Sequence, residues 1–151
     1  MARLEVDGFD AILSGLEDMI EALPELRNEI LTAEADVIEP AVRAAVKSSG
    51  LYDTGTLYRS IGRSTVKVSG RSGKIPAIKI GPRGEHHRYL PSKGKKGIVT
   101  AGYVGYIYEY GLERRGIPAR KWLSGAVEQS KGPAFSAAER VYDEYLKKNN
   151  L

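Results

Sequence analysis

Few side chains in this sequence are arranged to carry out catalysis. The two histidines, His86 and His87, are adjacent, and neighbouring side chains seldom face the same way, so we expect no metal site there. Residues 70–75 lack the first spacing of a phosphate-binding loop and the hydroxyl after its lysine, and we interpret them as a hairpin turn. The sequence contains no G-x-S-x-G nucleophile elbow, no H-E-x-x-H motif and no cysteine. We therefore predict a protein that is not an enzyme and has no metal or cofactor.

Aromatic side chains point instead to binding. Four of the nine tyrosines lie close together, at Tyr103, Tyr106, Tyr108 and Tyr110. Tyrosine offers a large, stiff contact surface with a polar tip, and it is enriched at protein interfaces. About half of these rings could pack in the core, so we expect alternate rings to face inward and outward. We interpret Trp122 as a core anchor at the start of a helix.

The charges divide sharply along the chain. Residues 1–40 carry 2 basic and 11 acidic side chains, whereas residues 41–100 carry 13 basic and 2 acidic ones. Surfaces of opposite sign steer association and fix register, so this division favours contacts between like subunits. An acidic helix packed beside a basic sheet, each facing only solvent, would explain the same numbers.

A basic segment at residues 81–102 is the second candidate for binding. It is long for a compact domain, and such loops are commonly functional. Its cations could bind nucleic acid by releasing phosphate counterions, or they could contact a neighbouring subunit. These candidate contact residues are Arg83, Arg88, Lys93, Lys95 and Lys96.

Apolar periodicity predicts two helices in the first third of the chain. Apolar side chains recur every three or four residues over 9–23 and again over 26–44, and the second helix should run to about residue 47. Pro24 suits the first turn of the second helix, while Pro40 should kink or divide it. Residues 48–50 should end it.

The middle of the chain predicts a hairpin. Apolar and polar residues alternate over 63–68 and 77–80, with the turn at 70–73 between them. Pro76 places the second strand at a sheet edge. Segment 103–110 is ambiguous, because its composition favours a strand while its length also suits two helical turns.

The last third of the chain predicts further helices. Pro118 should open one helix, residues 132–133 should interrupt it, and residues 135–146 should form the final one. The expected fold class is α+β, with N-terminal helices, a small antiparallel sheet containing the hairpin, and C-terminal helices packed on one face.

The length fits a single domain over residues 1–151. We expect a helical part over 1–50, the sheet with its basic loop over 51–111, and C-terminal helices over 112–151. The sequence has no cysteine, no secretory signal and no apolar run near the roughly 20 residues that a membrane span needs. We therefore expect an intracellular protein with no membrane contact.

Two segments of the chain have the form of known sequence motifs. Residues 53–61 are similar to a T-G-x-L-x-x-S-I element, and residues 106–111 and 117–123 are similar to a Y-x-x-E-(aromatic)-G … P-A-R-P-(aromatic)-L element. Together they resemble the small head–tail joining, or tail-completion, proteins of long-tailed bacteriophages. The order of the elements also agrees, from about residue 8 to residue 147. The residues that carry the resemblance are Thr54, Gly55, Leu57, Ser60, Ile61, Glu109, Gly111, Pro118, Ala119, Trp122 and Leu123.

The sequence also departs from the family pattern. Lys121 stands where proline is usual, Leu112 stands where threonine is common, and the loop at 81–102 is long and basic. These departures bear on loop contacts and on the ring partner more than on the fold.

The resemblance implies a structural virion protein with neither catalytic activity nor cofactor. It would form a ring, expected to be a hexamer, at the neck or the head-proximal tail end of a siphophage or prophage. Its partners would be itself, the head connector and the tail tube or tail terminator proteins, with DNA possible in the channel. It would be found in the virion, and in the host cytoplasm before assembly. The alternative is a nucleic-acid-binding module that uses the loop 81–102.

Overall fold

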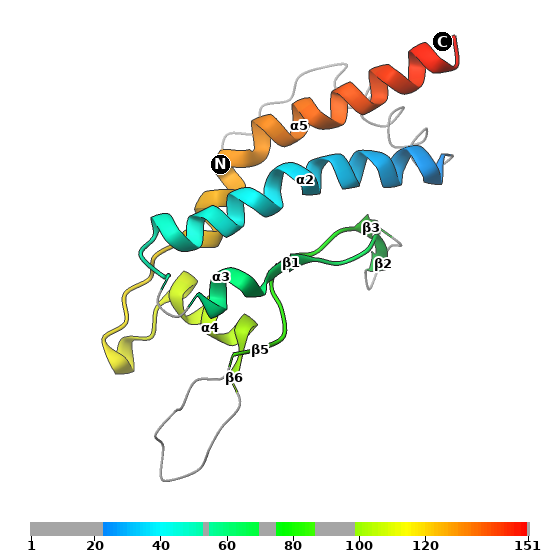
Figure 1. Ribbon diagram of the computed structural model, residues 1–151. Helices are drawn as coiled ribbons and strands as arrows, with labels where there is room; N and C mark the ends of the chain where they lie inside the picture. The colour runs from blue at the N-terminus through cyan, green and yellow to red at the C-terminus, as the bar shows by residue number, and fades with distance from the viewer. Residues whose placement is uncertain (1–22, 53–54, 70–74, 87–98, 151) are drawn as a thin grey trace, which may run out of the picture.

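The computed structural model describes residues 23–52, 55–69, 75–86 and 99–150. Two long helices, α2 (Pro24–Ser48) and α5 (Trp122–Lys148), lie side by side and run in opposite directions (Figure 1). Two shorter helices, α3 (Thr56–Ser60) and α4 (Ala101–Tyr110), lie beside the C-terminal half of α2. A short 3₁₀ helix, η1 (Glu113–Arg115), connects α4 to α5.

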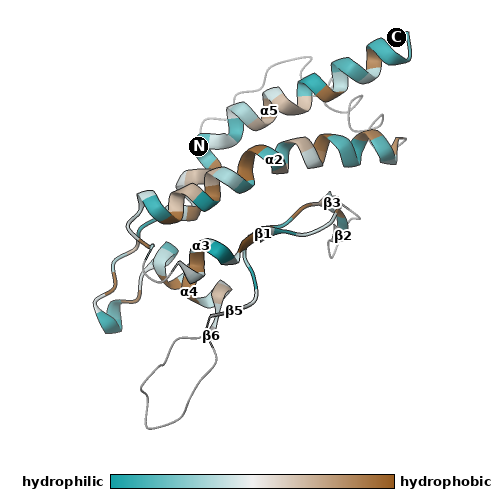
Figure 2. Ribbon diagram, viewed as in Figure 1, coloured by the Kyte–Doolittle hydropathy of each residue, from teal (hydrophilic) through white to brown (hydrophobic). Residues whose placement is uncertain are grey.

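Helix α2 follows from its apolar spacing. Its buried side chains are Leu26, Ala35, Val42 and Val46. The steps of seven and four residues among the last three keep them on one face of the helix. Figure 2 shows hydrophobic and hydrophilic residues alternating along this helix, as packing on one side and solvent on the other require.

One cluster of buried side chains joins distant parts of the chain. It takes residues from α2, from α3 and its flanks, and from the start of α5, and it consists of Val42, Val46, Leu51, Leu57, Ile61, Trp122 and Ala126. Burying apolar area is the main favourable term in folding. This cluster therefore fixes where α5 begins relative to the rest of the chain.

The described strands form three antiparallel pairs. Strand β1 (Ile61–Arg63) pairs with β4 (Ile80–Pro82), β2 (Lys67–Ser69) with β3 (Ile75–Ala77), and β5 (Glu85–His86) with β6 (Val99–Thr100). Between the first two pairs, the amide of Ser64 donates to the Lys79 carbonyl at 2.9 Å, and the amide of Lys79 donates to Ser64 Oγ at 3.0 Å. The hairpin and the α+β fold class are thus confirmed. Each strand predicted over 63–68 and 77–80 is divided into two short ones.

The predicted break at residues 132–133 is wrong, and Pro40 does not divide its helix. Helix α2 is continuous through Pro40, and α5 is continuous through Pro133, so one C-terminal helix replaces the expected two. Both prolines are exposed. The carbonyl that each leaves unbonded can therefore reach water, and packing between α2 and α5 offsets the cost of about 3 kcal/mol. Helix α5 also begins at Trp122, not at Pro118.

Segment 103–110 is helical, not extended. Thr100 caps α4, since its Oγ1 accepts from the Tyr103 amide at 3.2 Å. This cap and the contacts with α5 described below outweigh the strand preference of tyrosine.

Several sequence predictions fall outside the described residues. These are the helix over 9–22, Thr54, the turn at 70–73 and residues 87–98 of the basic loop. The part of that loop that is described contains β5, β6 and the start of α4. Among the described helices, none is both long and apolar enough to cross a membrane.

Candidate interaction surface

Helix α4 is locked to the start of α5 by a buried carboxylate. Glu109 is 4% exposed, and its Oε2 accepts a hydrogen bond from the Leu123 amide at 2.8 Å. Its Oε1 accepts from the Ser124 amide at 3.3 Å and from the Ser124 hydroxyl. The first amides of a helix have no partner within the helix, and negative charge is favoured there. Glu109 therefore caps α5 from a neighbouring helix.

Trp122 forms a second link between the two helices. Its indole Nε1 donates to the Gly105 carbonyl at 3.1 Å, and the residue is 2% exposed. A Cβ on Gly105 would lie 2.8 Å from Pro82 Cγ and 3.2 Å from Trp122 Cζ2. Glycine at position 105 thus lets α4 approach both side chains, and the prediction that Trp122 anchors the core is confirmed.

The connection from α4 to α5 is also tightly held. Gly111 has φ of 81°, and a Cβ there would lie 2.8 Å from the Ala119 nitrogen and 2.9 Å from the Ile117 oxygen. Leu112 and Ile117 pair as an antiparallel bridge. The guanidinium of Arg120 donates to the Ser49 carbonyl at 2.6 Å, which ties the connection to the end of α2. Pro118 and Ala119 are exposed within this connection.

The first family-like segment has a comparable structural role. Gly55 adopts φ of 74° immediately before α3, and a Cβ there would lie 2.9 Å from an Arg59 nitrogen. Leu57 and Ile61 are buried in the core cluster. Ser60 Oγ donates to the Leu57 carbonyl at 2.7 Å near the end of α3. The described residues of this segment fix the backbone around α3, as Glu109, Gly111 and Trp122 fix it between α4 and α5.

Three tyrosine rings occupy the outer face of α4. Tyr103, Tyr106 and Tyr110 are 51%, 60% and 59% exposed, and their spacing of three and four residues places them along one helical face. The Tyr106 and Tyr110 ring centroids are 4.7 Å apart, and Lys121 Nζ lies 5.0 Å from the Tyr110 centroid. Tyr108 is half-buried against the core cluster. Rings therefore do face both ways, but with helical and not strand periodicity.

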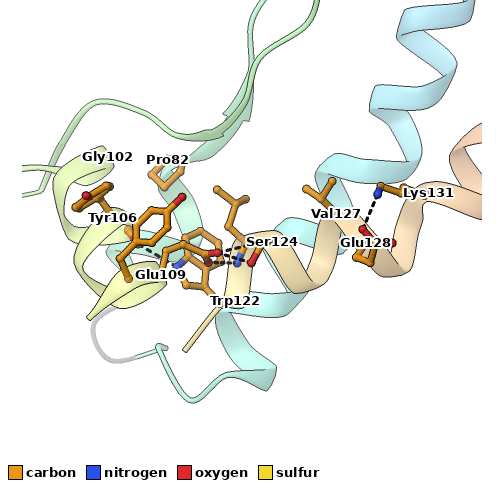
Figure 3. Close-up of a pocket in the computed structure, with 12 residues that line it drawn as sticks. Pro82, Gly102, Tyr106, Glu109, Trp122, Ser124, Val127, Glu128 and Lys131 are labelled. Carbon is orange, nitrogen blue, oxygen red and sulfur yellow. Dashed lines mark hydrogen bonds and ion pairs between the residues drawn. The ribbon is translucent and has the colours of Figure 1, made fainter. Parts of the chain in front are cut away.

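A groove of about 520 Å³ runs beside these rings (Figure 3). Pro82, Leu123 and Val127 give it an apolar lining, and Tyr106 and Trp122 face it. On α5, Lys131 Nζ and Glu128 Oε2 form an ion pair of 2.5 Å at the groove. We name this groove together with Tyr103, Tyr106 and Tyr110 the tyrosine face.

Only one of the five basic candidates, Arg83, lies within the described residues. Arg83 is exposed, its amide donates to the Ser60 carbonyl at 2.8 Å, and its guanidinium donates to the Arg63 carbonyl. Arg88, Lys93, Lys95 and Lys96 lie outside the described residues. Strands β5 and β6 bring residues 86 and 99 together, so the two ends of that segment meet at the start of α4.

Two ionisable groups have shifted pKa values. Burial raises the pKa of the Glu34 carboxyl on α2. A hydrogen bond from Arg63 Nη1 to Asp36 Oδ1, of 2.5 Å, raises the pKa of Arg63. Arg63 Nε also lies 3.5 Å from Glu39 Oε2, so β1 is attached to α2 by charge. Within the described part of the chain, no three histidine or acidic side chains cluster as metal ligands would.

Comparison with protein families, curated proteins and solved structures finds no match to this chain. The sequence pointed to Trp122 as a core anchor, and it pointed to Glu109 and Gly111 only through a resemblance, so the structural roles of Glu109 and Gly111 come from the contacts above. It missed Gly105, Ser124 and Pro82. Neither glycine nor serine at these positions belongs to a periodic pattern, and Pro82 lies some 20 residues from α4 in the sequence.

Proposed function

We propose that this chain is a structural virion assembly protein, a tail-completion or head–tail joining subunit that forms a ring at the neck or the head-proximal tail end. The residues that resemble the phage family support this proposal, because together they hold α4, the start of α5 and the preceding segment against one another. Glu109, Gly111 and Trp122 hold α4 against α5. Leu57 and Ile61 attach the preceding segment to the same core cluster.

The tyrosine face is the observation that carries the proposal. Exposed aromatic rings beside an apolar groove are the composition of an interface centre. The rings lie on a helix whose position is fixed by buried hydrogen bonds. A fixed surface loses little conformational freedom on binding, which favours stable assembly. We propose that this face contacts a neighbouring subunit or a connector or tail protein.

Deleting the gene in the phage or prophage that encodes it tests the role in assembly. The expected result is filled heads and separate tails by electron microscopy, with joined particles restored when the wild-type chain is supplied in trans. Negative-stain images of the purified protein, alone and with tails, should show rings. Normal particle yield from the deletion would refute the proposal.

Substitution of the tyrosine face separates binding from folding. The free energy of unfolding of the Tyr106→Ser/Tyr110→Ser double variant should lie within about 1 kcal/mol of the wild-type value, since exposed positions contribute little to stability. It should nevertheless fail to restore joined particles. Phe135→Ser is the matched control, because Phe135 is 62% exposed and lies on α5 beyond the groove. Equal restoration by both variants would exclude the tyrosine face as the contact.

Nucleic-acid binding through the loop 81–102 is the alternative function. It would give an affinity that falls steeply with salt concentration, because counterions are released on binding. Replacing Arg83, Arg88, Lys93, Lys95 and Lys96 with glutamine should then abolish binding to duplex DNA. Unchanged affinity in that variant would dispose of this alternative. In a ring both functions could coexist, with the loop reaching DNA in the channel.

A further inference from the structure

The structure concentrates opposite charges at the two ends of the helix pair. Residues 24–39 of α2 carry five acidic side chains and one basic one, and they lie beside the C-terminal half of α5. Residues 113–121 carry four basic side chains and one acidic one, and they lie just before α5, near the end of α2. The acidic end belongs to the acidic first part of the chain, whereas the basic end lies beyond the basic segment 41–100.

Arg63 already pairs with Asp36 and Glu39 at the acidic end, but the remaining acidic side chains there cannot reach the basic end within one chain. From Trp122 to Glu144 the helix rises about 33 Å at 1.5 Å per residue. Salt screens interactions between exposed charges beyond about 8 Å at physiological ionic strength. A second molecule is therefore needed to bring the basic end and the acidic end into contact.

The acidic end contains a groove of about 810 Å³ between the first turns of α2 and the last turns of α5. Exposed Glu25, Glu29 and Glu144 line it, with Lys148 as the one lysine among its lining residues and Val141 and Tyr145 half-buried. Within the described residues, none of these three carboxylates forms an ion pair. A cation that entered the groove would find several unpaired acceptors.

The basic end presents a rigid turn. The bridge between Leu112 and Ile117 closes it, and Gly116 adopts φ of 64° at its end. Arg114 and Arg115 are exposed in η1, and neither forms an ion pair within the described part of the chain. Figure 1 shows η1, in yellow, projecting away from the α2–α5 pair. We name residues 112–117 the arginine turn.

We infer that copies of this chain associate head to tail, with the arginine turn of one copy seated in the acidic α2–α5 groove of the next. The inference rests on the proposed ring and names its subunit contact. Guanidinium groups pair with carboxylates through two parallel hydrogen bonds, which fixes orientation as well as charge. The two surfaces differ, so the contact is heterologous. Such contacts close into rings when the rotation permits.

Reciprocal charge reversal tests this contact. The Arg114→Glu/Arg115→Glu variant and the Glu29→Arg/Glu144→Arg variant should each self-associate at least about tenfold more weakly than wild type by sedimentation velocity, as like charges then oppose one another. A mixture of the two variants should regain association, because each supplies the surface that the other lacks. The control Lys67→Glu/Lys79→Glu reverses two exposed cations on the hairpin and should associate as wild type does.

Cross-linking gives a second measurement that does not depend on affinity. The chain contains no cysteine, so a mixture of Arg115→Cys and Glu29→Cys proteins can form an unlike disulfide dimer only between the introduced thiols. That dimer should form readily under mild oxidation, and much less when Lys79→Cys replaces Arg115→Cys.

Three results would overturn the inference. One is a wild-type protein that stays monomeric at low salt and high concentration. Another is a mixture of the two reversed variants that does not regain association. Joined particles restored by the arginine-turn variant would likewise exclude this contact while leaving the virion role intact. Absence of any particle defect on gene deletion would instead refute the proposed function itself, so the two failures are distinguishable.

Discussion

Replacing Glu109 with glutamine tests whether this carboxylate holds α4 and α5 together. Both of its oxygens accept hydrogen bonds from the first turn of α5, at Leu123 and Ser124. Glutamine keeps one acceptor oxygen and turns the other into a donor that faces an amide. Each lost hydrogen bond is worth about 1 kcal/mol, and more for a charged acceptor, so Glu109→Gln should lose about 2 kcal/mol of unfolding free energy. Glu109→Ala removes all three bonds and should lose about 3 kcal/mol or more.

Urea denaturation followed by circular dichroism measures these differences. Glu113→Gln is the matched control, because Glu113 is exposed in η1 and should change stability by less than about 0.5 kcal/mol. Hydrogen exchange locates the effect, since the amides of Leu123 and Ser124 should lose protection in Glu109→Gln. Wild-type stability in the glutamine variant, with both amides still protected, would refute the capping role of Glu109.

Three further predictions concern backbone, charge and packing. Gly111→Ala should lose about 2 kcal/mol or more, because φ of 81° and contacts of 2.8 and 2.9 Å leave no space for a Cβ. Gly125→Ala, inside α5 with no atom within 4 Å of its added Cβ, should gain about 0.5–1 kcal/mol. Urea denaturation measures both changes in stability, and equal changes in the two variants would contradict the geometry. Burial raises the pKa of Glu34, so the folded state holds this proton more tightly than the unfolded chain. The stability that protonated Glu34 contributes is fully present below the pKa of Glu34 in the unfolded chain. It is lost as the pH rises through the pKa of Glu34 in the folded protein. Glu34→Gln should therefore raise the melting temperature at pH 7 but not below about pH 4, and a constant difference across that range would contradict the assignment. Trp122→Phe should lower the free energy of unfolding by about 1–3 kcal/mol, because the buried Gly105 carbonyl loses its donor. A smaller loss would show that this hydrogen bond is unimportant.

The parts of the fold that follow from local patterns were predictable. The existence of helix α2 is visible in the apolar spacing over 26–44, although that spacing did not identify Val42 and Val46 as its buried residues. The hairpin is visible in the alternation on either side of residues 70–73. The buried position of Trp122 was predicted as well. In each case the signal and the structure share one period, so one stretch of sequence is enough.

The parts that depend on tertiary contacts were not predictable. Pro133 reads as a break until α2 is known to pack along α5 on both sides of it. Tyr103 to Tyr110 stays ambiguous between strand and helix until the contacts of Thr100 and Glu109 are known. The tyrosine face was foreseen as a set of residues, yet its groove requires Pro82 and Val127 from separate elements. Sequence spacing alone contains no information about such contacts between separate elements.

The core cluster also has a consequence for synthesis of the chain. Val42 and Val46 emerge from the ribosome long before Trp122 and Ala126, which cover them in the folded protein. Contacts of such separation close slowly, because the intervening chain must first be ordered. The part of this apolar face that α5 covers therefore stays exposed until about four-fifths of the chain has been translated. Nascent chains that end before Trp122 should therefore bind chaperones and resist folding.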